Sequence, residues 1–183
     1  MTNVRRLQLH IVGLDHFLQN LETKCLTEAG KSEEIRQKKE LSEFLSRIIQ
    51  ENRVRLVAEE GKLDRPCLGC VLAKQNGAQH VDVTMPISER ERYGIQTPGY
   101  DRNEDTRKAA YQAFEQYMFD KVQETHADDA ALMMVGRRHL RGLTALFQTA
   151  GCEVSTYDIN DCGWYLGIPN EGADGVVGYI REE

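Results

Sequence analysis

Short apolar runs alternate along the chain with longer segments in which apolar residues recur every three or four positions. Short runs of this kind are typical of buried strands, and the longer periodic segments are typical of amphipathic helices. Strands are predicted over residues 7–12, 53–58, 79–84, 131–135 and 153–159, with two further short strands at 164–167 and 176–180. Helices are predicted over residues 32–52, 64–74, 87–93, 105–124 and 139–150.

This order of strands and helices predicts an α/β fold. Right-handed crossovers between parallel strands place helices on both faces of the sheet, so we expect a three-layer sandwich with a largely parallel central sheet. The last two short strands are expected to be antiparallel additions. The polar segment 17–31 is predicted to be a loop or irregular helix that lies over His16, where it could act as a lid. The 183 residues suit one domain, and we expect a single α/β domain over residues 1–183.

Charge and hydropathy narrow the range of partners. The net charge is -6 and there is no basic block, which argues against a nucleic-acid groove or an anionic membrane surface. No stretch approaches the roughly 20 apolar residues of a membrane span, and the N-terminus does not resemble a signal peptide. We therefore expect a cytoplasmic protein that acts on a small molecule or a peptide. An edge strand or the long helix could support a homodimer.

The five cysteines are an odd number, so a disulfide framework is not expected. Cys67 and Cys70 have the Cys-x-x-Cys spacing, but a zinc site of four thiolates would need a second such pair. We interpret the two residues as small side chains that pack on a helix near the core. A redox-active dithiol is the alternative.

Two Gly-x-x-His motifs are the strongest clue to function. Gly13 to His16 follows the first predicted strand, and Gly136 to His139 follows the fourth. Glycine permits a sharp turn of the backbone where each strand stops. Because ligands of open α/β sheets bind at the carboxyl ends of the strands, we expect His16 and His139 to converge.

Other polar residues occupy further predicted strand ends. The set comprises Asp15, His16, Glu59, Glu60, Asp82, Arg137, Arg138 and His139. Two imidazoles and a carboxylate can hold a divalent metal ion such as Mn, Co or Zn and lower the pKa of bound water toward about 7. The predicted ligands are His16, Glu59 and His139.

Chemistry without a metal is equally available to these residues. A histidine that a carboxylate orients can take a proton from water, while a second histidine or Arg137 or Arg138 stabilises the oxyanion. The remaining histidines are interpreted differently. His10 and His80 fall inside strands and are expected to pack or lie on a sheet face, and His126 is expected to be exposed to solvent.

The order of these motifs resembles the TraB/Tiki, ChaN and erythromycin-esterase-like superfamily. The resemblance covers residues 7 to about 159 and includes the strand that ends in Glu59, the long helix, and Gly142-Leu143 after the second motif. It implies an α/β fold with a cleft that uses both histidines and the strand-end Glu. Tiki-like peptidases hydrolyse with a divalent metal, erythromycin-esterase-like proteins with water activated by His, and ChaN-like relatives are associated with haem.

Position by position, the resemblance assigns His16 and His139 to the two motif histidines. It assigns Glu59 to the strand-end Glu, with Glu60 as the alternate register. Relatives often carry an Arg beside an acidic or amide residue in the long helix, where this chain has Phe114-Glu115-Gln116. Arg107, two helical turns earlier on a similar face, is the candidate to replace that Arg.

Three functions follow from these observations. The first is a hydrolase in which His16, Glu59 and His139 bind a metal or activate water, and Arg137 or Arg138 holds an anionic group. The second is a non-catalytic protein whose cleft binds a small ligand, a metal or haem. The third is an interaction module with a vestigial cleft. The residues predicted to serve catalysis are His16, His139, Glu59, Glu60, Arg137 and Arg138.

Overall fold

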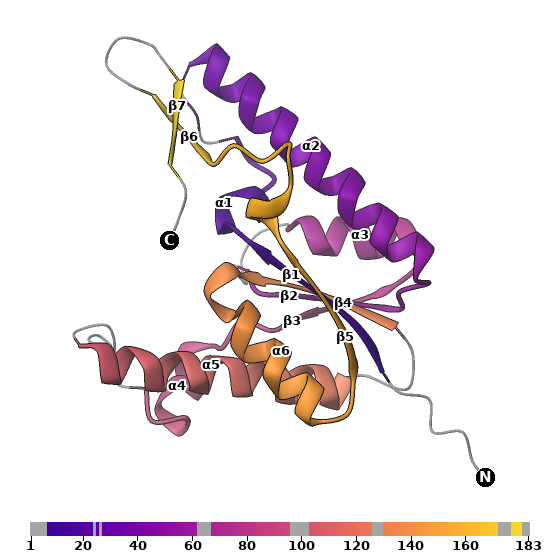
Figure 1. The fold of residues 1–183 in the computed structure, drawn as a ribbon, viewed down its shortest axis with the longest axis vertical. Coiled ribbons are helices and arrows are strands. Elements are labelled where there is room, and N and C mark those ends of the chain that lie inside the picture. Colours follow the sequence, from indigo (N-terminus) through magenta and orange to yellow (C-terminus); the bar gives the residue numbers. More distant parts are fainter. Residues whose placement is uncertain are drawn as a thin grey trace.

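A parallel five-stranded sheet forms the centre of the protein (Figure 1), seen in a computed structural model that describes residues 7–23, 25, 27–61, 67–95, 103–125, 130–171 and 177–180. The strand order is β3-β2-β4-β1-β5, and each neighbouring pair is parallel. The strands are β1 (Gln8–Leu14), β2 (Leu56–Glu59), β3 (Gln79–Asp82), β4 (Ala130–Gly136) and β5 (Glu153–Asp158).

Helices cover both faces of this sheet, which confirms the predicted three-layer α/β sandwich. The helices are α1 (His16–Gln19), α2 (Glu28–Glu51), α3 (Leu68–Asn76), α4 (Ile87–Arg92), α5 (Glu104–Thr125) and α6 (Leu140–Thr149), with single 3-10 turns η1 (Arg137–His139) and η2 (Ile159–Asp161). Figure 1 shows α2 and α3 on one side of the sheet and α5 and α6 on the other. Within the described residues, no helix combines the length and the apolar character that crossing a membrane requires.

The strands supply two separate cores because successive side chains point to opposite faces of a sheet. Val12 and Val57 pack in the core beside α2 and α3. Ile11, which precedes Val12, and Ala58, which follows Val57, pack in the core beside α5 and α6. Burial on both faces explains why these strands appear in the sequence as continuous apolar runs.

The path of the chain creates a crevice at the carboxyl ends of the strands. From β1 the chain continues into α1 and α2 on one face, whereas from β4 it continues into η1 and α6 on the other face. Since β1 and β4 are neighbours, their connections diverge to opposite sides of the sheet. Such a switch point is where open α/β sheets bind ligands.

The segment 17–31, predicted to be a loop or irregular helix, contains parts of two helices. Residues 16–19 form α1, and α2 begins at Glu28 instead of residue 32. The Thr27 side chain caps this helix by accepting a hydrogen bond from the Gly30 N–H at 3.2 Å. A threonine cap satisfies a backbone donor that would otherwise be unpaired, and this favours the earlier start.

The C-terminal strands also differ from the prediction. β6 (Ile168–Glu171) and β7 (Val177–Ile180) are antiparallel, as expected, but they form a separate two-stranded sheet beside α2 (Figure 1). Residues 164–167 are not a strand. The buried Gln37 side chain accepts from the Leu166 N–H and donates to the Gly167 carbonyl at 3.2 and 3.1 Å, so these backbone groups pair with a side chain instead of a sheet.

Parts of the sequence predictions fall outside the described residues. His126, expected to be exposed to solvent, belongs to the segment 126–129, and the start of the predicted helix 64–74 belongs to the segment 62–66. The boundaries of the other helices agree with the prediction to within a few residues. Gly77, for example, ends α3 in the left-handed conformation with φ 66°.

His10 is a packed residue, as its position within a strand predicted. It is buried in β1, its ring stacks on Tyr157, and its Nδ1 lies 3.3 Å from the Tyr157 hydroxyl. Burial lowers the pKa of His10, and the negative charge of Glu153 opposes this shift. The native protein therefore favours the neutral ring.

We expect His10 to make the native state less stable in acid. Because its native pKa lies below the unfolded value of about 6.5, the unfolded chain binds the extra proton first, and stability is lost as pH falls below that value. Urea denaturation at pH 7 and pH 5 measures this loss, which has a limiting slope of about 1.4 kcal/mol per pH unit for one proton. His10→Phe should reduce the loss, and Tyr157→Phe, which keeps the imidazole, should retain it. An equal loss in wild type and His10→Phe would contradict the assignment.

Candidate active site

The two Gly-x-x-His motifs meet at one pocket. The cavity has a volume of about 310 Å³ and is lined by Asp15, His16, Tyr111, Gly136, Arg137, Arg138 and His139. Leu14 at the end of β1 pairs with Gly136 at the end of β4, which places the two motifs side by side. The sheet topology therefore produces the convergence expected from the sequence.

The motif glycines allow close approach and not a sharp turn. Gly13 and Gly136 both lie within strands, and neither is among the described residues with positive φ. A Cβ on Gly13 would lie 3.3 Å from the Arg137 Cα, and a Cβ on Gly136 would lie 2.8 Å from the His16 Nε2. Each glycine thus leaves room for the other motif, which corrects the role that the sequence suggested for both.

Glu60 is the carboxylate that faces the two motif histidines. Its Oε2 lies 4.0 Å from the His16 Nε2, and its Oε1 lies 3.6 Å from the His139 Nε2. The Gly136 N–H donates a hydrogen bond of 2.8 Å to Oε2 and fixes the carboxylate. Each histidine is therefore next to a different oxygen of one side chain.

Glu59 points to the opposite face of the sheet. Its side chain is 1% exposed, its Oε2 accepts from the Gly69 N–H at 2.9 Å, and it lies 3.4 Å from the His80 Nε2. The expected metal trio of His16, Glu59 and His139 is not gathered around one point, because neighbouring residues at a strand end project to opposite sides. Glu60, the alternate register, occupies the place expected for Glu59.

Gln19 determines which nitrogen of His16 carries a proton. The Gln19 Nε2 donates to the Glu60 carbonyl at 2.9 Å and to the Glu59 Oε1 at 3.3 Å, so this end of the amide must be the NH₂ group. The Gln19 Oε1 then accepts from the His16 Nδ1, 2.7 Å away. In the neutral imidazole, the Nε2 of His16 is therefore the unprotonated nitrogen.

His139 is buried between two carboxylates. Its Nδ1 lies 3.4 Å from Glu115 Oε1, while its Nε2 faces Glu60. The rings of Tyr111 and Phe114 pack against it with centroids at 5.2 and 6.3 Å. In the imidazolium form, both nitrogens can donate to a carboxylate, so His139 is suited to hold Glu60 in position.

Glu115 is a site residue that sequence reasoning did not select. It lies on α5 and is buried, and it reaches His139 because α6 carries Gly142, where a Cβ would overlap the Glu115 carboxylate. Two features of the sequence could have identified Glu115, namely its acidic position in the long helix and the glycine at position 142. Arg107, the candidate replacement for the family Arg, is exposed on α5.

The two motif arginines have different surroundings. The Arg137 Nε donates to Asp158 Oδ1 at 3.0 Å, and its Nη1 lies 3.9 Å from the buried Asp15, so this guanidinium is balanced by two carboxylates. Arg138 is exposed, and its Nη1 donates to the Tyr111 hydroxyl at 3.1 Å. Arg138 is therefore the better placed of the two to contact an anionic group.

Asp82 does not line the pocket. Its Oδ1 accepts a hydrogen bond of 2.7 Å from the Thr84 N–H, in the turn that follows β3. This contact satisfies a backbone donor where the chain leaves the sheet. Its position at a strand end therefore reflects the local turn.

Cys67 lies at the start of α3 and not in the core, and Cys70 is exposed. Burial raises the pKa of Cys67 to about 12, with a further contribution from its hydrogen bond to the Glu59 carboxylate. The Cys67 sulfur also lies 3.7 Å from the His80 Nε2. The interpretation of the Cys-x-x-Cys pair as two residues packed near the core is therefore corrected, because Cys70 is exposed and Cys67 is only half-buried.

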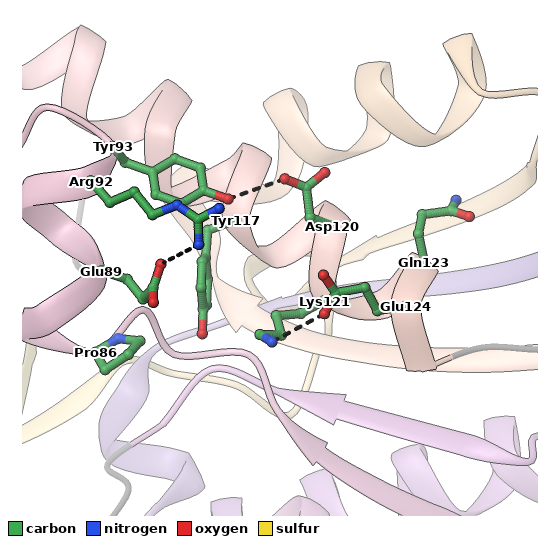
Figure 2. A pocket seen from close by; sticks show the side chains of 9 residues that line it. All are labelled: Pro86, Glu89, Arg92, Tyr93, Tyr117, Asp120, Lys121, Gln123 and Glu124. Carbon is green, nitrogen blue, oxygen red and sulfur yellow. Dashed lines mark hydrogen bonds and ion pairs between the residues drawn. The ribbon is translucent and has the colours of Figure 1, made fainter.

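A larger cavity of about 450 Å³ lies between α4 and α5 (Figure 2). Its polar side chains pair with one another. The Tyr93 hydroxyl donates to Asp120, and ion pairs join Arg92 to Glu89 and Lys121 to Glu124 (Figure 2). These contacts engage most of the polar side chains of this wall with one another, whereas the strand-end pocket presents two histidines, so the strand-end pocket remains the stronger candidate for catalysis.

Comparison with protein-family models, curated proteins and solved structures finds no match for this chain. The functional argument therefore depends on the chemistry and geometry of the site.

The close approach of the two motifs can be tested at Gly13. We expect Gly13→Ala to lower the free energy of unfolding by about 1–3 kcal/mol, because the new methyl group meets the Arg137 backbone. Gly163→Ala is the matched control, since a Cβ there meets nothing within 4 Å, and its effect should stay within about 0.5 kcal/mol. Urea denaturation measures both, and equal stabilities would show that the motifs do not pack this closely.

Proposed function

We propose that this protein is a hydrolase in which His16 acts as a general base on a water molecule. One observation carries the proposal. Gln19 engages the Nδ1 of His16, and the basic Nε2 is left on the wall of a pocket. The His16 side chain is 52% exposed, so water and substrate can reach this nitrogen.

The reaction requires a proton to move from water to His16. As the Nε2 takes this proton, the oxygen of the water attacks the carbonyl carbon of an ester or amide. The resulting imidazolium lies next to the Glu60 carboxylate, which stabilises the positive charge. The same proton can then pass from His16 to the leaving group as the carbonyl re-forms.

The remaining residues are assigned roles according to their contacts. Arg138 is proposed to bind the oxyanion or an anionic group of the substrate, since guanidinium groups recognise such charges well. His139 and the Gly136 N–H both contact the Glu60 carboxylate and hold it toward His16. Gln19, Glu115 and His139 are therefore positioning residues.

The resemblance to Tiki-like peptidases implies a divalent metal at the motif histidines. The residues present do not fit one ion at that point, because Glu59 faces away and, among the described residues, the ligand atoms of His16, Glu60 and His139 do not all lie within 4.8 Å of one another. The proposed route therefore follows the water-activating chemistry that the erythromycin-esterase-like branch of the resemblance implies. No step depends on a metal.

Activity measurements on a panel of activated esters and short peptides test this proposal. We expect His16→Ala to lower kcat/KM by about 10²–10⁴-fold, the usual contribution of a general base. Gln19→Leu should lower kcat by a smaller factor with little change in KM, because it releases the imidazole without touching substrate. His10→Phe, which alters a histidine remote from the pocket, should leave activity unchanged.

Two results would contradict the hydrolase assignment. Full turnover in His16→Ala would show that His16 is not the base. Ligand binding without turnover across the panel, weakened by Arg138→Ala, would instead favour the non-catalytic binding protein.

A further inference from the structure

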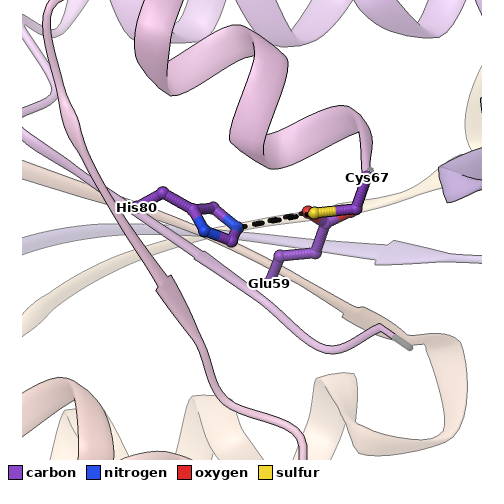
Figure 3. Close-up of side chains that lie close together, drawn as sticks. All are labelled: Glu59, Cys67 and His80. Atoms are coloured by element: carbon purple, nitrogen blue, oxygen red, sulfur yellow. Dashed lines mark hydrogen bonds and ion pairs between the residues drawn. The ribbon is translucent and has the colours of Figure 1, made fainter. Parts of the chain in front are cut away.

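A second group of reactive side chains lies on the other face of the sheet. Glu59 at the end of β2, Cys67 at the start of α3 and His80 in β3 point toward one another (Figure 3). Each offers one ligand atom, and these atoms all lie within 4.8 Å of one another. Among the described residues, no other three His, Cys, Asp or Glu side chains meet this condition.

The separations match those around a tetrahedral zinc ion. Typical zinc bonds place an imidazole nitrogen and a carboxylate oxygen about 3.4 Å apart, and a nitrogen and a thiolate sulfur about 3.6 Å apart. In this protein the His80 Nε2 lies 3.4 Å from Glu59 Oε2 and 3.7 Å from the Cys67 sulfur. A cation could therefore bind without a large movement of the side chains.

Hydrogen bonds hold the Glu59 carboxylate in place. The Gly69 N–H donates to Glu59 Oε2, and the Gln19 Nε2 donates to Oε1. A Cβ on Gly69 would lie 2.5 Å from Oε2, so glycine is needed for this approach. Outer hydrogen bonds of this kind fix the orientation of metal ligands. The Glu59 carboxylate is 1% exposed, and a bound cation would stabilise its buried negative charge, because an anion is costly to bury without a counter-charge.

The identity of the ligands indicates the class of cation. Thiolate, imidazole and carboxylate together suit zinc, whereas calcium and magnesium prefer oxygen alone. The His80 side chain is 22% exposed, so solvent reaches the group. Three protein ligands would leave a fourth position for water, as in many zinc sites.

We propose that Glu59, Cys67 and His80 form a binding site for zinc or a similar divalent transition-metal ion. The Cys67 sulfur lies within 4.8 Å of a Glu59 carboxylate oxygen. When the sulfur binds the ion, the thiol proton is released to solvent and the sulfur donates its electron pair to the metal. The ion would join β2, α3 and β3, and this site is distinct from the proposed hydrolase site.

Cobalt titration of the full-length, reduced protein tests this site. We expect one Co²⁺ per chain with a sulfur-to-cobalt charge-transfer band that one equivalent of Zn²⁺ removes. Cys67→Ser should abolish the band, and His80→Gln should weaken the affinity at least about tenfold. Cys152→Ser is the matched control for loss of a half-buried thiol elsewhere, and it should retain the band. His16→Ala should also retain it, which separates this site from the hydrolase pocket.

Thermal denaturation keeps the test valid if a variant is destabilised. Zn²⁺ should raise the Tm of wild type and of Cys152→Ser, but not that of Cys67→Ser, since only binding to the native state stabilises it. A charge-transfer band that persists in Cys67→Ser would overturn the proposal, as would the absence of metal binding in wild type. Metal binding that is lost in His16→Ala and kept in Cys67→Ser would place the ion at the motif histidines, and would overturn this site and the metal-free hydrolytic route together.

Discussion

The alternation of side chains at the end of β2 is the constraint on which both sites depend. Glu59 is the last residue of a strand with a core on each face, and Glu60 follows it directly, so the two carboxylates project to opposite sides of the sheet. Glu60 reaches the two motif histidines, and Glu59 reaches the start of α3 and His80. The two adjacent acidic residues therefore belong to two different sites. Either carboxylate could reach the other site only if the two faces of the strand were exchanged.

Gln19 connects these environments. Its amide donates to Glu59 and to the Glu60 backbone and accepts from His16, so all three contacts are set by the orientation of one planar group. Because the amide is buried, reversing it would leave donors facing donors and acceptors facing acceptors. A change in the charge on Glu59 would therefore alter the hydrogen bond that Gln19 donates to it and, through the same amide, the hydrogen bond between Gln19 and His16. The proposed metal site and the proposed catalytic base share this coupling, although each can be tested alone.

The sequence predicted the parallel α/β sandwich because its strands are buried on both faces and its helices keep a clear apolar period. The position of each motif directly after a predicted strand also predicted that His16 and His139 converge at the carboxyl ends of the sheet. It did not decide between Glu59 and Glu60, since that choice depends on which face each strand position occupies. Glu115 was missed because its partner, His139 on η1, lies 24 residues later in the chain. Cys67 was considered only together with Cys70, whereas its neighbours in the structure are Glu59 and His80. The start of α2 was predicted at residue 32 instead of Glu28 because the cap at Thr27 was not recognised.

The strand order has a consequence for how the protein is made. β4 lies between β2 and β1, so the first two strands to leave the ribosome have no contact with each other until the chain has been extended past residue 136. Folding must therefore wait for pairings between distant segments, which slows it and leaves strand edges exposed to other chains. A nascent chain that stops short of β4 would carry His16 and Glu60 but no strand to bring them together. The pocket can therefore form only after β4 and the residues that follow it, through His139, have been synthesised.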